Sequence, residues 1–259
     1  MTNKIRSMDR VLSRKQVNIL GVRVDSTTEE EVLRVIGQKV AKEGQMYIVT
    51  PNPEIVLQAQ DDRVLAEIIA KADFSLPDGS GLRLAEPGLN IIHGRKFMLR
   101  LFGMADREKL KVFFITSDER DTKDNLLIRL GKDYPGIKAW AAVGPRVGLD
   151  GRPVTEVDSK VNKDIVDEIN NFKPDFLFVC FGQIKQEKWI YNNLGSLRAK
   201  LAIGVGGALD YYAGTKPFPP KWMEYLELEW LWRVFSEGNI VRVFKAVVVF
   251  PIKLFLSKF

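Results

Sequence analysis

Cysteine and histidine are almost missing from this chain of 259 residues, which contains only Cys180 and His93. A single cysteine excludes an intramolecular disulfide framework and fits a reducing compartment. No apolar run approaches the roughly 18 uncharged residues that a transmembrane helix needs. The polar and basic start, Met1 to Gln16, lacks the apolar centre of a signal peptide, so we expect a cytoplasmic protein.

Two motifs of nucleotide-dependent enzymes are absent as well. The sequence contains no Asp-x-Asp, the usual clamp for a diphosphate and its metal ion, and one histidine is too few for a metal site. The first strand-like run, around Ile19 to Val22, is not followed by the glycine fingerprint of a nicotinamide oxidoreductase. We therefore expect chemistry without a bound metal ion or cofactor, and the oxidoreductase interpretation is disfavoured.

The chain does contain enough apolar residues for a full core, 46% of the total, together with a modest net charge of +6. The length fits one large domain, or one domain plus an extension. The charge suits an anionic substrate or an anionic lipid surface better than a nucleic acid, whose binders are usually more basic. The composition carries no signal for an oligomeric state.

Strand-like and helix-like segments alternate along the chain. Short apolar runs typical of strands span 17–24, 46–49, 73–76, 111–116, 137–143, 176–181 and 201–205. Segments with helical periodicity or helix start signals span 25–41, 54–72, 97–104, 121–130, 157–172 and 184–194, with a short helix after Gly207. This order predicts a Rossmann-like α/β fold, a mostly parallel sheet with helices on both faces. We expect residues 1–215 to form this domain and 216–259 a helical appendage.

Two polar turns follow strand-like runs in the first third of the chain. Asp78 lies in Leu76-Pro77-Asp78-Gly79, where the proline ends the ladder and the glycine permits an open backbone. Thr50 and Asn52 lie in Thr50-Pro51-Asn52, after the run 46–49. Ligands of open α/β sheets bind outside the carboxyl ends of the strands, so the two turns predict the rim of an active site. The alternative is that Pro-Asp-Gly is simply a good turn.

Two later strand-like runs end in segments that suit an anionic or hydroxylated ligand. A helix opens directly after 176–181, with Gln183 and Gln186 one turn apart where free N–H groups favour phosphate or sugar hydroxyls. After the last run, Gly206 and Gly207 allow a ligand to approach the backbone closely. Ordinary helix capping and a tight connection that needs no ligand are the respective alternatives.

Taken in order, five such pieces resemble the WecG/TagA/CpsF family of bacterial glycosyltransferases, from about Val17 to about Arg233. They are Thr50-Pro51-Asn52, Leu76-Pro77-Asp78-Gly79, Gly182 with Gln186-Glu187 and Trp189-Ile190, Gly204-Val205-Gly206-Gly207 with Asp210 and Ala213-Gly214, and Leu228-Glu229-Trp230-Leu231 with Arg233. The resemblance implies transfer of N-acetylmannosamine or a related sugar, with inversion, from a UDP donor to undecaprenyl-diphosphate-linked N-acetylglucosamine. It also implies a place at the inner face of the cell membrane, in surface-polysaccharide or teichoic acid synthesis.

The resemblance assigns roles to individual residues. Asp78 takes the place of the family's proposed general base, and Thr50 and Asn52 line the pocket. The further predicted substrate-binding residues are Gln183, Gln186, Gly206, Gly207, Asp210, Arg233 and Arg242. A positioned carboxylate is also what the chemistry requires, because an acceptor hydroxyl must lose its proton as it attacks an anomeric carbon.

This chain departs from the family pattern at three places. Ile184 replaces the proline of Gly-x-Pro-x-Gln-Glu, and Phe218 replaces the arginine of Arg-Ala-Pro. The segment 237–243 lacks both arginines of Glu-Pro-x-Arg-x-x-Arg in register. Such arginines would pair with a donor diphosphate. The cations that could substitute for them are Arg233, Arg242, Lys216 and Lys221.

The last twenty residues, 240–259, combine large apolar side chains with four cations and no acids. This composition favours a peripheral contact with an anionic membrane, and a helix packed on the domain is the alternative. We predict an inverting, metal-independent glycosyltransferase with a UDP-sugar donor and a lipid-linked acceptor. The alternative from a different class is a catalytically weak sugar-nucleotide-binding or scaffold protein of the same fold, which the missing arginines favour and the intact Asp78 turn disfavours.

Overall fold

A computed structural model describes residues 14–42, 44–117, 120–225, 232 and 244–257. Its centre is a six-stranded sheet of parallel strands in the order β4-β3-β8-β7-β5-β6. The strands are β3 (Met46–Val49), β4 (Phe74–Ser75), β5 (Lys111–Thr116), β6 (Lys138–Val143), β7 (Phe176–Val179) and β8 (Leu201–Gly204). Every residue of β3, β7 and β8 is buried, which explains their continuous apolar sequences, because strands covered on both faces need apolar side chains on both.

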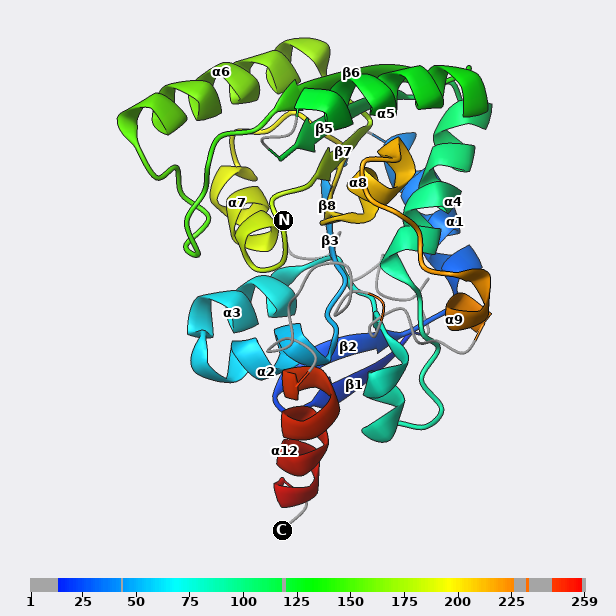
Figure 1. Ribbon diagram of the computed structural model, residues 1–259, viewed down its shortest axis with the longest axis vertical. Coiled ribbons are helices and arrows are strands. Elements are labelled where there is room, and N and C mark those ends of the chain that lie inside the picture. The colour runs from blue at the N-terminus through cyan, green and yellow to red at the C-terminus, as the bar shows by residue number, and fades with distance from the viewer. Residues whose placement is uncertain (1–13, 43, 118–119, 226–231, 233–243, 258–259) are drawn as a thin grey trace, which may run out of the picture.

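Helices cover both faces of the sheet, as Figure 1 shows. One face packs against α1 (Glu29–Val40), α4 (Gly94–Arg107), α5 (Arg120–Asp133) and α8 (Ala208–Ala213). The other packs against α2 (Pro53–Asp61), α3 (Arg63–Lys71), α6 (Glu156–Phe172) and α7 (Lys185–Asn193). In β7, Phe176 and Phe178 join the first core while Leu177 and Val179 join the second, as the two-residue period of a strand requires. The predicted Rossmann-like α/β fold class is confirmed.

The predicted strand over 17–24 is wrong, because the chain reverses in its middle. Strands β1 (Lys15–Ile19) and β2 (Val22–Ser26) form an antiparallel hairpin. Both turn residues, Leu20 (φ 49°) and Gly21 (φ 82°), have the positive φ of a tight hairpin turn. The apolar pattern from 17 to 24 continues through these two residues without a polar break, so the pattern does not reveal the turn.

The hairpin protects the edge of the parallel sheet at β4. Asp25 of β2 is fully buried, and its Oδ2 accepts a hydrogen bond from the backbone N–H of Ser75 at 2.8 Å. The hydroxyl of Ser75 donates to the carbonyl of Arg23 at 2.6 Å, and the Arg23 guanidinium lies 3.4 Å from Asp25. These contacts occupy polar groups at a sheet edge that would otherwise be open to pairing with another chain.

The predicted helix over 54–72 is also corrected, since it divides at Asp62 into α2 and α3. Asp62 has a non-helical backbone (φ −121°, ψ 89°), and its side chain caps α3 by accepting from Leu65 N at 3.0 Å. Aspartate competes for backbone donors in this way, which favours caps over helix interiors. The periodicity of the apolar residues persists across the break because both helices pack on the same core.

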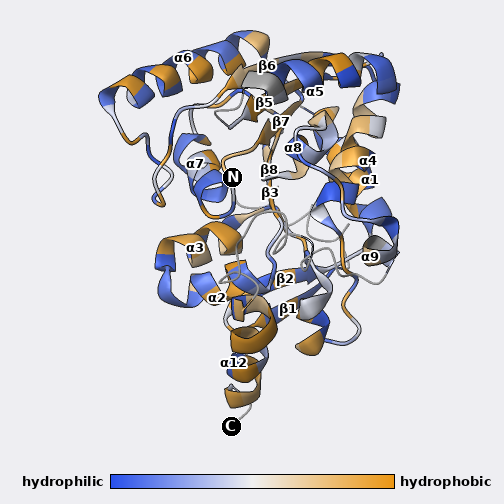
Figure 2. Cartoon of the chain, viewed as in Figure 1, coloured by the Kyte–Doolittle hydropathy of each residue, from blue (hydrophilic) through white to orange (hydrophobic). Residues whose placement is uncertain are grey.

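The chain ends in a π-helical turn, η3 (Lys245–Val249), continued by α12 (Phe250–Leu256). Phe250 and Leu254 are buried in the same core as α2. Large apolar side chains remain exposed on this segment, among them Val248, Ile252 and Leu256. Figure 2 shows α12 as a largely apolar helix that projects from the body of the protein. None of the described helices is long and apolar enough to cross a membrane. The predicted domain boundary at residue 215 stays a prediction.

Candidate active site

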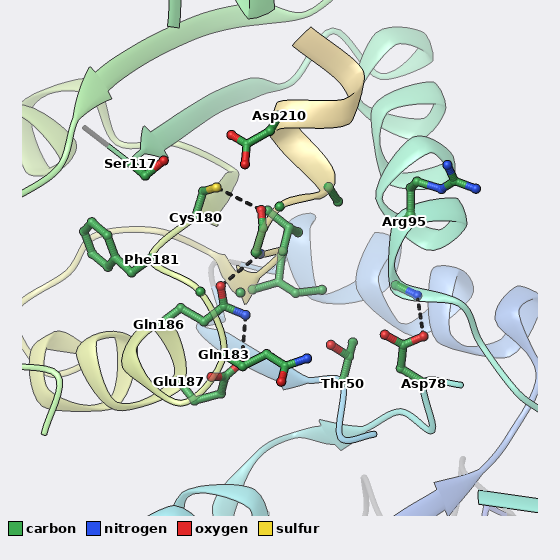
Figure 3. Close-up of a pocket in the computed structure, with 18 of the residues that line it drawn as sticks. Thr50, Asp78, Arg95, Ser117, Cys180, Phe181, Gln183, Gln186, Glu187 and Asp210 are labelled. Atoms are coloured by element: carbon green, nitrogen blue, oxygen red, sulfur yellow. Dashed lines mark hydrogen bonds between the residues drawn. The ribbon is translucent and has the colours of Figure 1, made fainter. Parts of the chain in front are cut away.

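A cavity of about 280 Å³ lies at the carboxyl edge of the parallel sheet (Figure 3). Five of the six strands end at it, and each contributes lining residues from the segment that follows it. The lining includes Thr50 after β3, Asp78 after β4, Ser117 after β5, Phe181 to Gln183 after β7, and Val205 to Ala208 together with Asp210 after β8. The two turns that the sequence singled out therefore meet at one site. This is the place where open α/β sheets bind ligands.

Asp78 faces the cavity from a turn that is tied to its neighbour and to a helix start. Its backbone N–H donates to the carbonyl of Pro51 at 2.9 Å, which joins the two predicted turns. Its Oδ1 accepts from the N–H of Gly94, the first residue of α4, at 3.3 Å. The partial positive charge of a helix N-terminus attracts a carboxylate. A Cβ on Gly94 would lie 3.3 Å from Asp78 Oδ2, a tight contact that the glycine avoids.

Thr50 and Asn52 separate in the structure, although they belong to one motif. Thr50 lines the cavity. Asn52 is the N-cap of α2, and its Oδ1 accepts from Ile55 N at 2.9 Å. Proline in the first turn and asparagine at the cap form a strong helix start. The predicted ligand contact of Asn52 stays a prediction, since its side chain is outside the cavity lining.

The turn between β7 and α7 has a strained backbone held by a buried acid. Ile184 has φ 72° and ψ −50°, a conformation that a β-branched residue rarely adopts. Its N–H donates to Oε2 of the buried Glu187 at 2.6 Å. A proline has no N–H and its ring fixes φ at about −65°, so a proline at this position could not adopt this turn. Strain of this kind persists only where surrounding contacts enforce it.

Gln186 connects this turn to the glycine loop after β8. Its Oε1 accepts from Gly206 N at 2.9 Å, and its Nε2 donates to Glu187 Oε1 at 2.8 Å. A Cβ on Gly204 would lie only 2.6 Å from the Gln186 side chain, so the close packing itself requires a glycine. The predicted ligand-binding amide thus holds two loops together. We call the hydrogen-bonded set of Ile184, Gln186, Glu187 and Gly206 the loop brace.

Glu187 accepts hydrogen bonds at both carboxylate oxygens, from Ile184 and from Gln186. Burial raises the pKa of Glu187 above its ordinary value, and these hydrogen bonds oppose that shift. An ionised carboxylate offers acceptors only, which matches the two donors that face it.

Gln183 differs from Gln186 in its surroundings. Both glutamines line the cavity, but the Oε1 of Gln183 is buried without a hydrogen-bond partner among the residues that the structure describes. A buried acceptor without a donor is costly, so a hydroxyl or amide N–H of a ligand would complete it. Of the two predicted glutamines, Gln183 is therefore the one whose side chain suits a substrate.

Acidic and basic side chains meet at the side of the cavity next to α8. The carboxylate of the buried Asp210 lies 3.1 Å from Nζ of Lys216. Across the opening, the guanidinium of Arg95 stacks 5.3 Å from the ring centre of Phe218. Gly206 and Gly207 line the cavity as predicted. Arg233 and Arg242 lie outside the described residues.

The sequence did not point to Arg95, Ser117 or Cys180 as lining residues. Arg95 is the second residue of a helix that follows a loop without strand character. Cys180 lies within an apolar run, and its Sγ donates to the carbonyl of Gly206 at 2.8 Å. Ser117 directly follows a predicted strand, the one local signal that could have found it. Within the described ranges, no three His, Cys, Asp or Glu side chains converge as metal ligands would.

The fold and the cavity define an α/β enzyme with a carboxylate at the carboxyl edge of its sheet. Residues 17–259 match the Glycosyl transferase WecG/TagA/CpsF family, so the chain belongs to this family and is a glycosyltransferase.

The chain is also similar to named proteins of Staphylococcus aureus. It is 29% identical over 250 residues to the N-acetylglucosaminyldiphosphoundecaprenol N-acetyl-beta-D-mannosaminyltransferase of strain MRSA252. The proteins of that name from strains MW2 and NCTC 8325 show the same 29% identity. Each of these similarities covers 94% of this chain and 93% of the relative.

The loop brace generates a stability prediction for Glu187→Gln. The new amide can accept one of the two hydrogen bonds, but its NH₂ must face the other donor. We expect a loss of about 1–3 kcal/mol in the free energy of unfolding, measured by urea denaturation. The control Glu108→Gln changes the same groups at an exposed position and should stay within about 0.5 kcal/mol. Equal stability of Glu187→Gln and the control would show that the brace contributes nothing.

Proposed function

We propose that the protein transfers N-acetylmannosamine, or a closely related sugar, from a UDP donor to a polyprenyl-diphosphate-linked N-acetylglucosamine. The names of the Staphylococcus aureus relatives support this acceptor and this sugar. The observation that carries the proposal is the Asp78 carboxylate, held at the edge of a cavity that also contains cationic side chains. The reaction belongs to the synthesis of a bacterial surface polysaccharide or teichoic acid.

The proposed mechanism is a single displacement. Asp78 takes the proton of the acceptor hydroxyl while the hydroxyl oxygen forms a bond to the anomeric carbon of the donor. The bond from this carbon to the diphosphate breaks on the opposite side, UDP leaves with the electron pair, and the anomeric configuration inverts. Cationic side chains at the cavity, Arg95 among them, stabilise the charge that develops on the leaving diphosphate.

The base role of Asp78 is tested by Asp78→Asn. The amide has nearly the same shape but cannot take a proton, so turnover should fall by about two to four orders of magnitude. Affinity for UDP should change less than about threefold, because the base acts on the acceptor. Rates come from a radiolabelled transfer assay with a soluble lipid-diphosphate-sugar analogue. The matched variant Asp61→Asn changes an exposed residue and should turn over at the wild-type rate. A folded Asp78→Asn enzyme with unchanged turnover would remove Asp78 from the mechanism.

We further propose that transfer needs no metal ion and no cofactor besides the donor, since side-chain cations can meet the leaving diphosphate. Transfer in an excess of EDTA should then stay within about twofold of the untreated rate in the same assay. Complete loss of transfer, restored by Mg²⁺ or Mn²⁺, would contradict this proposal.

The acceptor is a lipid, so we propose that the protein works as a peripheral protein on the cytoplasmic face of the cell membrane. Val248, Ile252 and Leu256 are spaced four residues apart, which places them on one side of the terminal helical segment, and all three are exposed. A helix that lies in a membrane interface buries such a side and gains from nearby cations. Lys245 and Lys253 belong to the same segment.

The double variant Ile252→Asp/Leu256→Asp tests this membrane contact. The two side chains are 54% and 64% exposed, so the change should leave the fold intact. Full burial of one such side chain in an apolar phase contributes roughly 1.5–3 kcal/mol to the binding free energy. Binding of the double variant to anionic liposomes should therefore weaken at least about tenfold in a sedimentation assay. The control Ile128→Asp/Leu149→Asp adds the same charge at exposed sites away from this helix and should bind like the wild type. Equal sedimentation of both variants would place the membrane contact elsewhere.

A further inference from the structure

Two cationic side chains of the described residues line the cavity, Arg95 and Lys216. They come from different parts of the chain, Arg95 from the first turn of α4 and Lys216 from the segment after α8. The segment with Lys216 also contains Phe218, at the position where the family pattern has an arginine. The segment thus has no cation at residue 218 but has one two residues earlier, at Lys216.

Lys216 is held in place through both its side chain and its backbone. Its Nζ lies 3.1 Å from Oδ2 of Asp210, a side chain that is 6% exposed. The N–H groups of Thr215 and Lys216 both donate to the carbonyl of Asp210, at 3.0 and 3.3 Å. Because one residue anchors both ends of the lysine, its ammonium group has a defined position at the wall of the cavity.

That position is next to the glycine loop at the end of β8. A Cβ built on Gly207 would lie 3.7 Å from Nζ of Lys216, so the ammonium group sits beside bare backbone. The Lys216 side chain is 35% exposed, which leaves it open to the cavity. Lysine binds phosphate as a point charge, and its hydrogen bonds to phosphate oxygens are charge-assisted.

We propose that Lys216 is a cation that binds the diphosphate of the donor, held ready by Asp210. The inference rests on the proposed UDP donor and assigns a cation of this chain to its diphosphate. Phe218 acts on the second cation, Arg95. The centre of its ring lies 5.3 Å from the Arg95 guanidinium, and this contact orients the guanidinium. The glycine loop and Lys216 together form the side of the cavity that receives the phosphates.

The test compares the affinities of Lys216→Gln for UDP and for uridine with those of the wild type, by calorimetry on the full chain. Glutamine can still donate a hydrogen bond to Asp210, so the fold should survive, but the positive charge is gone. Affinity for UDP should fall about ten- to a hundredfold, while affinity for uridine, which has no phosphate, stays within about twofold. The uridine measurement also reports whether the variant is folded.

Two further variants sharpen the test. Lys216→Arg keeps the charge and should bind UDP within about fivefold of the wild type. Lys96→Gln removes one positive charge from an exposed residue next to Arg95, outside the cavity lining, and should leave both affinities unchanged.

The outcomes separate this inference from the proposed function. If the wild type binds UDP more tightly than uridine and Lys216→Gln keeps this preference, Lys216 does not bind the diphosphate and only the inference fails. If the wild type binds neither UDP nor uridine, the proposed UDP donor fails and the inference fails with it. A loss of UDP affinity in Lys96→Gln as large as in Lys216→Gln would show a general charge effect and would also overturn the inference.

Discussion

The parallel pairing of β3, β8 and β7 is the constraint on which the rest of the structure depends. Met46 pairs with Leu201, and Leu201 pairs with Phe176, so three segments far apart in sequence lie side by side and point the same way. Their carboxyl ends therefore reach the same edge of the sheet. Each strand is apolar throughout and turns polar or glycine-rich where it leaves the core. The cavity is lined by the segments that follow these strand ends, which explains why so many separate parts of the chain contribute to it.

The loops at this edge are held by contacts between them as well as by the sheet. Gln186 binds Gly206 across the gap between β7 and β8, and Glu187 holds the strained Ile184 in its unusual conformation. Cys180 adds a second hydrogen bond to the same glycine loop. A site on braced loops can hold its ligand-binding groups in place before the ligand arrives, which lowers the ordering that binding must otherwise impose. The buried polar groups here are thus part of how the cavity keeps its shape.

Helix α2 links the chemistry to the apolar end of the chain. Its N-cap is Asn52, two residues after Thr50 at the cavity, and the core that it packs in also contains Phe250 and Leu254 of the terminal helix. The exposed apolar side chains of that helix are consequently fixed relative to the site. Under the proposed function, this fixed relation would hold the cavity at a set distance from the membrane surface in which the lipid of the acceptor is anchored.

The sequence by itself determined the layered α/β architecture and two of the turns at the site. Continuous apolar runs such as 176–179 and the proline and glycine around Asp78 carry that information locally, since periodicity and turn chemistry act over a few residues. Local patterns failed at Leu20 and Asp62, where a hairpin turn and a helix break occur without interrupting the apolar sequence. Only the tertiary structure decided that, of the two glutamines at the cavity, Gln186 braces a loop while the Oε1 of Gln183 finds no hydrogen-bond donor in the described part of the chain. It alone brought Arg95 and Lys216 to the same cavity, because their meeting depends on strand pairing between distant segments, which no local pattern encodes.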